Sequence, residues 1–143
     1  MTKLVWLVKA PDDNRDPNLV RSCEDFLGEI EKSLGESLTF SENLEAFKQQ
    51  SLRLFFIGSG GSEQVFKTIY ESVDGPYVLL TTRSHNSLAA SMEILSYLNE
   101  QGEKGEILHG SPDEIAKRLK LLLRVADTRR KLAGMRLGVT GES

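Results

Sequence analysis

The sequence predicts a three-layer α/β fold, in which helices cover both faces of a doubly wound parallel sheet. Short apolar segments alternate with longer amphipathic segments about five times along the 143 residues. Three of the short segments, residues 4–8, 52–57 and 77–82, are mostly apolar, as expected of strands that are buried on both faces. We therefore expect a flavodoxin-like or Rossmann-like strand order, with a binding crevice at the carboxyl ends of the strands.

The first helix is predicted to begin at Asp16 and Pro17. An Asp can cap a helix, and a Pro fits the first helical position because no N–H is needed there. Gly35 ends this helix, and a weaker strand over residues 37–40 and a short helix over residues 41–50 follow. One face of the first helix carries apolar side chains that we expect to be buried, namely Leu19, Cys23, Phe26, Leu27, Ile30 and Leu34.

Two further helices follow the second and third strong strands. One begins at Ser62, and the other extends from about Asn86 to Gln101, where Gly102 stops it. Apolar side chains three or four positions apart predict the face of each helix that packs on the sheet. These are Val65, Phe66, Ile69 and Tyr70 in the first helix, and Leu88, Met92, Leu95 and Leu98 in the second.

A long helix is predicted after a short strand at residues 106–108. Ser111 and Glu114 stand at capping-box spacing, which predicts where this helix begins. Gly134 is expected to end it, and residues 136–139 are expected to form another strand that enters a strand-to-helix loop. We therefore expect one α/β domain over residues 1–134. Residues 135–143 would then open a second domain, so that the chain is a fragment of a longer protein.

The composition excludes several classes of function. The formal net charge of −3 gives no reason to expect nucleic acid or an anionic membrane surface as a partner. Cys23 is the single cysteine, so an intrachain disulfide and a cysteine metal cluster are excluded, and one thiol suits a reducing cytoplasm. No apolar stretch approaches the length of a membrane span.

A glycine- and serine-rich loop over residues 58–62 connects the second strong strand to the next helix. Backbone N–H groups at such a junction can point at an anion or at a sugar oxygen. The loop is not a P-loop, because no Gly-Lys-Ser/Thr follows, and its glycines lack the dinucleotide-binding spacing. A tight turn capped by a serine explains it equally well. If the loop binds a ligand, the contacts come from Ser59, Gly60, Gly61, Ser62 and Glu63.

The loop after the third strong strand, residues 81–87, is the expected second wall of the site. His85 and Asn86 offer donors and acceptors that suit a polyol, although a solvated or capping role would also explain them. Residues 12–16, after the first strand, could bind a cation or a hydroxylated ligand, or form only a polar loop. No side chains have the spacing of a catalytic triad, a zinc site or an acid/base carboxylate pair, so we predict no catalytic and no metal-binding residue.

Four stretches in order resemble the N-terminal domain of the L-fucose isomerase-like family, in the fucose/arabinose isomerase superfamily. They are residues 57–64 (Ile-Gly-Ser-Gly-Gly-Ser-Glu-Gln), 85–95 (His-Asn-Ser-Leu-Ala-Ala-Ser-Met-Glu-Ile-Leu), 107–110 (Ile-Leu-His-Gly) and 132–142 (Leu-Ala-Gly-Met-Arg-Leu-Gly-Val-Thr-Gly-Glu). The resemblance covers the chain from the third strand onward, and the first fifty residues match only as a general strand-helix lead.

The resemblance implies a cytoplasmic aldose–ketose isomerase or a relative of unknown substrate. In this family a divalent metal, typically manganese, is held by acidic residues and a histidine, and carboxylates move a proton through an enediol intermediate. Those residues lie in later domains, so the resemblance assigns none of them to this chain and implies the metal only for the full-length protein. The N-terminal domain of these oligomeric enzymes helps to complete the substrate pocket of a neighbouring subunit.

The first hypothesis is therefore a domain that contributes to a sugar pocket and to the assembly of a homo-oligomer, is inactive alone, and binds neither nucleic acid nor membrane. The predicted sugar contacts are the five loop residues at positions 59–63 together with His85 and Asn86. The alternative is a stand-alone module that binds a sugar phosphate or a nucleotide at the loop of residues 58–62. A third alternative is an interaction domain with an empty crevice.

Overall fold

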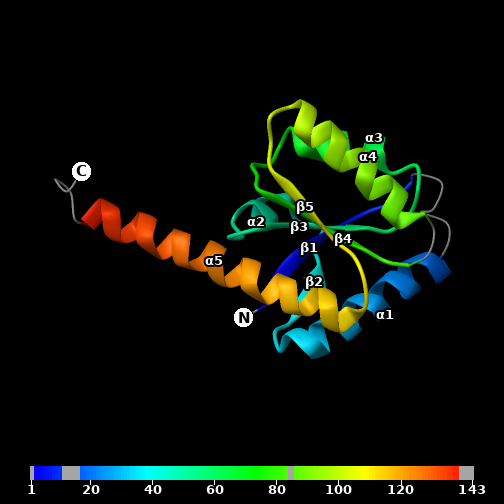
Figure 1. The fold of residues 1–143 in the computed structure, drawn as a ribbon, viewed down its shortest axis with the longest axis horizontal. Coiled ribbons are helices and arrows are strands. Elements are labelled where there is room, and N and C mark those ends of the chain that lie inside the picture. Colours follow the sequence, from blue (N-terminus) through cyan, green and yellow to red (C-terminus); the bar gives the residue numbers. More distant parts are fainter. Residues whose placement is uncertain (1, 11–16, 84–85, 139–143) are drawn as a thin grey trace.

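The computed structural model describes residues 2–10, 17–83 and 86–138. They form five parallel strands in the order β2-β1-β3-β4-β5, which is the flavodoxin-like order expected from the sequence. Figure 1 shows this sheet between two layers of helices, as predicted. The elements are β1 (Lys3–Val8), α1 (Pro17–Leu34), β2 (Leu38–Phe40), α2 (Leu44–Lys48), β3 (Arg53–Ile57), α3 (Glu63–Tyr70), β4 (Tyr77–Thr81), α4 (Ser87–Glu100), β5 (Gly105–Leu108) and α5 (Pro112–Gly138).

The strand order reverses between β1 and β3. From β1 the chain passes to β2 on one side, and it then returns to β3 on the other side of β1. Val8 pairs with Ile57 where these two strands end, so the loops that follow β1 and β3 start next to each other. In open α/β sheets, ligands bind outside the carboxyl ends of the strands at such a reversal. A ligand site is therefore expected at this edge of the sheet.

The two faces of the sheet carry separate hydrophobic clusters. α1 and α5 cover one face, and α2, α3 and α4 cover the other (Figure 1). β3 contributes to both, because side chains alternate along a strand: Leu54 and Phe56 pack under α1 and α5, whereas Phe55 and Ile57 pack on the opposite face. The Phe55 and Phe66 ring centroids lie 5.0 Å apart. Burial on both faces fixes β3, and with it the start of the loop that follows.

α4 packs on the sheet through a different face from the predicted one. The prediction that Leu88 and Met92 are buried is wrong, because these side chains are 36% and 59% exposed. Small residues let the helix lie close to the sheet, and the Ser87 and Ser91 hydroxyls each donate to a backbone carbonyl. The buried side chains of α4 are Ser87, Ala90, Ser91, Ile94 and Leu98. Two large apolar side chains are thus left on the surface.

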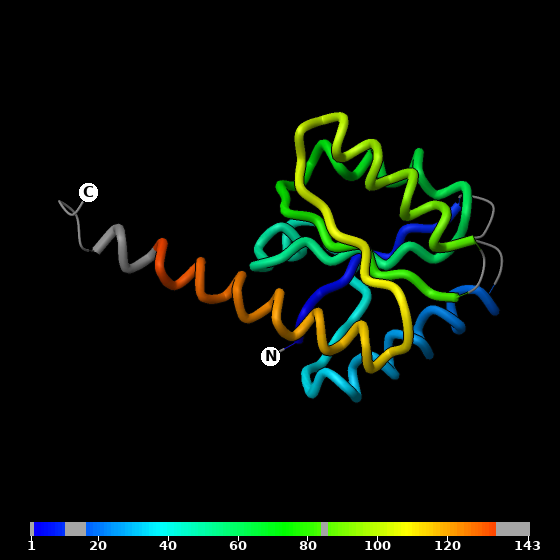
Figure 2. Tube along the Cα trace, in the orientation of Figure 1, coloured from blue at the N-terminus to red at the C-terminus, as the bar shows by residue number. Residues whose placement is uncertain are grey.

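α5 is longer than predicted. It continues to Gly138, so the predicted helix end at Gly134 and the predicted strand are wrong for residues 136–138, and Val139 lies outside the described residues. A glycine inside a helix costs about 1 kcal/mol relative to alanine. The residues around Gly134 are Ala, Met, Arg and Leu, and these favour a helix. Figure 2 shows α5 leaving the sheet and continuing beyond it.

Other predicted helix ends are confirmed. α1 begins at Pro17, and Gly35 follows it with a φ of +80°. The capping box of α5 is formed in both directions, with the Ser111 N–H donating to Glu114 Oε1 at 3.1 Å and the Glu114 N–H donating to Ser111 Oγ at 3.2 Å. α2 is shorter than the predicted range of 41–50, because Asn43 caps it.

None of the helices in the described ranges is both long and apolar enough to cross a lipid bilayer.

Candidate functional site

The loop of residues 58–62 lies against the chain that leaves β1. The Gly58 N–H donates to the Val8 carbonyl at 2.8 Å, and the Ala10 N–H donates to Ser59 Oγ at 3.1 Å. Ser59 is only 5% exposed. Its hydroxyl, which we predicted to contact a ligand, therefore joins the two loops at the reversal of strand order.

The remaining residues of this loop also serve its own conformation. Ser62 is fully buried, and its hydroxyl donates to the Ser59 carbonyl at 2.8 Å instead of capping α3. Gly60 is half-buried. Gly61 is exposed and has a φ of +75°, a backbone conformation that favours glycine. Of the predicted contacts in this loop, the glycine backbones are thus more accessible than the serine hydroxyls.

Glu63 places a carboxylate at the N-terminus of α3. Its pKa is lowered, first by a hydrogen bond with the Glu93 carboxyl of α4 and then by backbone N–H groups of Glu63 and Gly61. Its Oε2 atom is buried and has no hydrogen-bond partner among the described residues. The amides that could have bound a phosphate therefore already face a carboxylate of the chain itself.

The contact between Glu63 and Glu93 predicts a pH effect on stability. The Glu93 pKa is raised above 4.5 by its hydrogen bond to Glu63 and by the charge of Glu63. A raised pKa in the folded state means that this contact stabilises at low pH and is lost as the pH rises through that pKa. We expect Glu93→Gln, which can donate the hydrogen bond at any pH, to become more stable relative to the wild type from about pH 4.5 upward.

Urea unfolding between pH 4 and pH 7 measures this difference. Glu100→Gln, on the same helix, is the matched control and should not change the pH dependence. An identical pH dependence of the wild type and Glu93→Gln would show that the two carboxyl groups do not share a proton.

Ser87 connects the ends of β3 and β4. Its hydroxyl donates to the Ile57 carbonyl and accepts from the Thr82 N–H at 3.1 Å. Asn86, the N-cap residue of α4, is exposed and left-handed with a φ of 59°, and its side chain makes no capping hydrogen bond. The two loops chosen from the sequence are thus held together by a serine outside the predicted set, with Asn86 accessible beside it. The predictions for His85, residues 12–16 and Asp16 lie outside the described residues.

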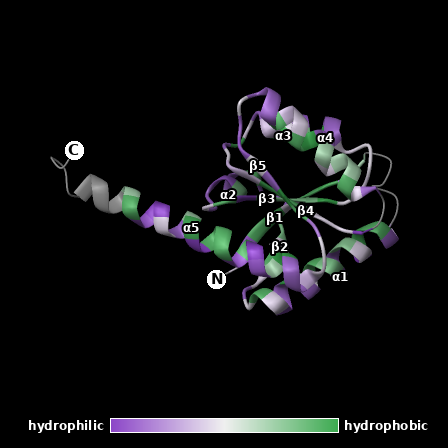
Figure 3. Ribbon diagram, in the orientation of Figure 1, coloured by the Kyte–Doolittle hydropathy of each residue, from purple (hydrophilic) through white to green (hydrophobic). Residues whose placement is uncertain are grey.

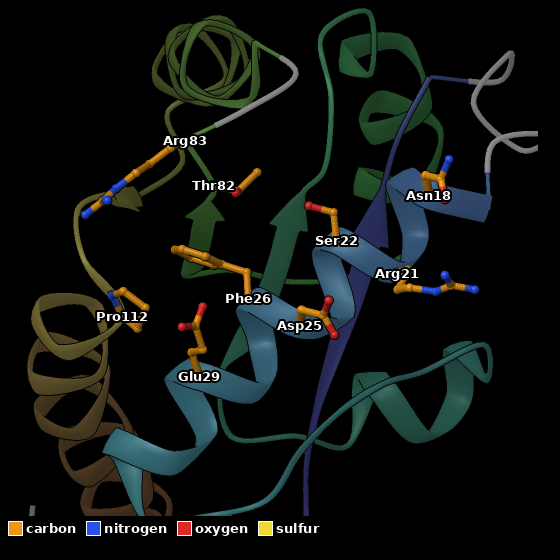
Figure 4. Close-up of a pocket in the computed structure, with 9 residues that line it drawn as sticks. All are labelled: Asn18, Arg21, Ser22, Asp25, Phe26, Glu29, Thr82, Arg83 and Pro112. Atoms are coloured by element: carbon orange, nitrogen blue, oxygen red, sulfur yellow. The ribbon is translucent and has the colours of Figure 1, made fainter.

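A cavity of about 490 Å³ opens at the same edge of the sheet, on the side of α1 and α5. Figure 4 shows the residues around it, which come from α1, from the chain after β4 and from the start of α5. They are Asn18, Arg21, Ser22, Asp25, Phe26, Glu29, Thr82, Arg83 and Pro112. The loop after β4 therefore does line a cavity, but its partner in the described structure is α1 and not the loop of residues 58–62.

The cavity combines an aromatic ring with hydrogen-bonding groups of both kinds. In Figure 4, Phe26 and Glu29 extend from α1 toward the space below Thr82, Arg83 reaches toward Pro112, and Arg21 points away from that space. The Phe26 ring is supported by the core, with its centroid 6.2 Å from that of Phe56. Carboxylate oxygens accept, a guanidinium donates and a hydroxyl does both, so the cavity can bind a ligand rich in hydroxyl groups.

No family model, no curated protein and no solved structure matches this chain. The assignment of a function therefore rests on the geometry of the site and on the sequence resemblance. Among the described residues, no three histidine, cysteine, aspartate or glutamate side chains come together as a metal site.

The α1 residues of the cavity were not among those predicted from the sequence. Ser22, Asp25 and Glu29 recur every three or four positions along one flank of the helix, which reads as an ordinary solvent face. The sequence also places Phe26 on the buried face, whereas it is half-buried. The strand order brings this flank of α1 near Thr82. The spacing of Ser22, Asp25 and Glu29 therefore indicates a site only once that order is known.

Proposed function

We propose that this chain is the N-terminal domain of an aldose–ketose isomerase-like protein of the cytoplasm, which contributes to a sugar-binding pocket and to oligomer assembly. The observation that carries the proposal is the cavity at the carboxyl edge of the sheet, where an aromatic side chain lies among carboxylates, hydroxyls and an arginine. The ordered resemblance of residues 57–64, 85–95, 107–110 and 132–142 to the L-fucose isomerase-like family supports the same conclusion.

The lining of the cavity suits a sugar. Glu29 and Asp25 can accept hydrogen bonds from neighbouring hydroxyl groups, and Arg83 can donate to a ring or carbonyl oxygen. The half-buried Phe26 ring offers an apolar surface to the C–H groups of a pyranose or an open-chain sugar. Ser22 and Thr82 add hydroxyl groups that can donate and accept.

In this proposal the chain binds and orients the sugar, while the metal and the groups that transfer the proton belong to other domains. The described residues do not fit a divalent metal, because they provide no cluster of ligands. We therefore assign no reaction step to a metal held by this chain, and we expect the isolated chain to be inactive.

A neutral sugar is a better candidate ligand than a sugar phosphate or a nucleotide. The N-terminus of α3 is the natural place for a phosphate, but the Glu63 carboxylate is already there, and hydrogen bonds from Glu93 and from backbone N–H groups hold its pKa low. A phosphate would have to displace this carboxylate or be repelled by it.

We expect Glu29→Gln to weaken sugar binding by roughly tenfold, because a hydrogen bond to a charged acceptor contributes more than about 1 kcal/mol. Calorimetric titration of the chain with a panel of free aldoses, ketoses and sugar phosphates measures this. Glu24→Gln is the matched control, since Glu24 is exposed on α1 and does not line the cavity.

Two results would contradict the proposal. One is the absence of saturable binding of any neutral sugar at millimolar concentration. The other is tight binding that requires a phosphate and is lost in Gly61→Val but not in Glu29→Gln, which would favour the alternative module built on the loop of residues 58–62.

A further inference from the structure

Another cavity, of about 340 Å³, lies at the opposite edge of the sheet from the proposed sugar site. It forms where α5 passes the amino ends of two strands, because Arg53 begins β3 and Pro76 directly precedes β4. The end of α2 and one flank of α5 complete its walls. A cavity of this volume is large enough for a small molecule.

Basic side chains dominate this cavity. Lys48, Arg53, Arg129 and Arg130 line it, and no acidic side chain is found among the described residues around it. Three other cavities formed by described residues each include carboxylates as well as basic residues. Since the whole chain has a formal net charge of −3, the excess of positive charge is a local property of this cavity.

The Arg53 guanidinium is held in place by the backbone around it. Its Nε donates to the Asp74 carbonyl at 2.8 Å, and its Nη1 donates to the carbonyls of Lys48, at 3.2 Å, and Gln50. The Arg53 side chain is half-buried as a result. A guanidinium that is fixed in this way loses little conformational freedom when it binds a ligand.

The position of Arg129 and Arg130 within α5 does not explain their charge. Basic residues stabilise the last turn of a helix, but α5 continues to Gly138, more than two turns beyond Arg130. Both arginines are exposed, and neither forms an ion pair with any described residue. Figure 3 shows strongly hydrophilic residues interspersed with hydrophobic ones along this part of α5.

Arg53 and Arg130 lie close enough to repel each other. The pKa of Arg53 is lowered, mainly by burial; the Asp74 carboxylate acts to raise this pKa, and the charge of Arg130 acts to lower it further. A bound anion would replace this repulsion with two attractions.

The acidic residues beside the cavity offset its charge only in part. Glu45 Oε1 is 3.6 Å from Lys48 Nζ, in an exposed pair. The Asp127 carboxylate accepts hydrogen bonds from Ser51 Oγ at 2.7 Å and from Lys3 Nζ at 3.4 Å. The positive charge of the cavity therefore comes mainly from its three arginines.

We propose that this cavity binds the phosphate group of a small molecule, at a site separate from the sugar cavity. The planar guanidinium group donates pairs of charge-assisted hydrogen bonds that match the oxygens of a phosphate. Three arginines from β3 and α5 can therefore hold one phosphate from two sides. The proposal does not depend on the proposed function, because the two cavities lie at opposite edges of the sheet and share no residue.

A small molecule suits this surface better than a nucleic acid or a lipid membrane. These large polyanions bind positive charge that is spread over an extended surface. Beside the cavity, however, the basic residues Lys120, Arg124 and Lys131 of α5 line a hollow together with Glu36 and Asp127. Acidic side chains thus interrupt the positive surface outside the cavity.

Calorimetric titration of the 143-residue chain with pyrophosphate, at constant ionic strength, tests the proposal. We expect saturable binding, with a dissociation constant raised roughly tenfold in Arg130→Gln, because charge-assisted hydrogen bonds are lost. The matched control is Arg124→Gln, which removes the same charge from an exposed position of α5 outside the cavity and should bind like the wild type. Pyrophosphate should also raise the melting temperature of the wild type more than that of Arg130→Gln.

Four results would overturn the proposal. The first is the absence of saturable pyrophosphate binding at millimolar concentration. The second is equal weakening in Arg130→Gln and Arg124→Gln, which would indicate attraction to the overall charge of α5. The third is loss of binding in Gly61→Val, which would place the phosphate at the loop of residues 58–62. The fourth is binding of anionic lipid vesicles or single-stranded DNA without binding of pyrophosphate.

Discussion

Replacing Phe55 with alanine should lower the free energy of unfolding by roughly 3–5 kcal/mol, the range for large aromatic-to-alanine substitutions in a core. Phe55 has no exposed surface and lies in β3, near the middle of the sheet. Its ring is 5.0 Å from Phe66, 5.3 Å from Phe47 and 6.2 Å from Tyr77 between centroids, so truncation removes contacts with three elements. Since small domains are stable by only about 5–15 kcal/mol, the variant would be close to unfolding.

Urea unfolding followed by circular dichroism measures the loss. Phe26→Ala provides the comparison, because this ring is half-buried at the edge of the cavity and should cost less stability while still changing the site. Equal losses of stability for the two variants would mean that the aromatic cluster around Phe55 is not the main core of the sheet face that α2, α3 and α4 cover.

Replacing Ser87 with alanine should cost roughly 1–3 kcal/mol, because it leaves two buried backbone groups without a partner. These groups are the Ile57 carbonyl and the Thr82 N–H, which the Ser87 hydroxyl joins. Ser91→Ala is a close control: this serine is also buried on α4, but it donates to a carbonyl of its own helix, which already accepts the ordinary helical hydrogen bond. We expect its loss to be smaller.

The Ser87→Ala variant also tests whether the two loops form one unit. Amide hydrogen exchange should become faster at Thr82 and in the loop of residues 58–62, while α1 and β1 remain protected. Sugar binding should weaken together with this change, because Thr82 and Arg83 line the cavity. Unchanged exchange at both loops would mean that other contacts hold the edge of the sheet.

Much of the fold could be predicted from the sequence, because its signals are local. Pro17, Gly35 and the pair of Ser111 and Glu114 each mark a helix end through backbone chemistry that does not depend on distant residues. The apolar strands likewise predict burial on both faces, and this led to the correct parallel sheet.

One error arose where tertiary contacts outweigh local preference, and another where several helix-forming residues outweigh a single glycine. The spacing and size of Met92 predict a core residue, but α4 approaches the sheet through Ala90 and through serines whose hydroxyls have backbone partners. Gly134 resembles a helix end, yet the surrounding helix formers carry α5 to Gly138.

The site was only partly predictable for a related reason. The loop of residues 58–62 was recognised by its glycines, but no sequence pattern shows that the Ser59 hydroxyl accepts from the Ala10 N–H, nearly fifty residues away. The α1 side of the cavity, with Glu29, required the strand order that brings α1 near Thr82.

The position of Cys23 gives the chain an intrinsic reporter of its own opening. The thiol is 1% exposed on α1, and a Cβ placed on Gly58 would lie 3.2 Å from its sulfur. A thiol-specific reagent can therefore reach it only when α1 separates from the end of β3. The rate at which such a reagent modifies the native chain, compared with the unfolded chain, would measure how often this corner of the molecule comes apart.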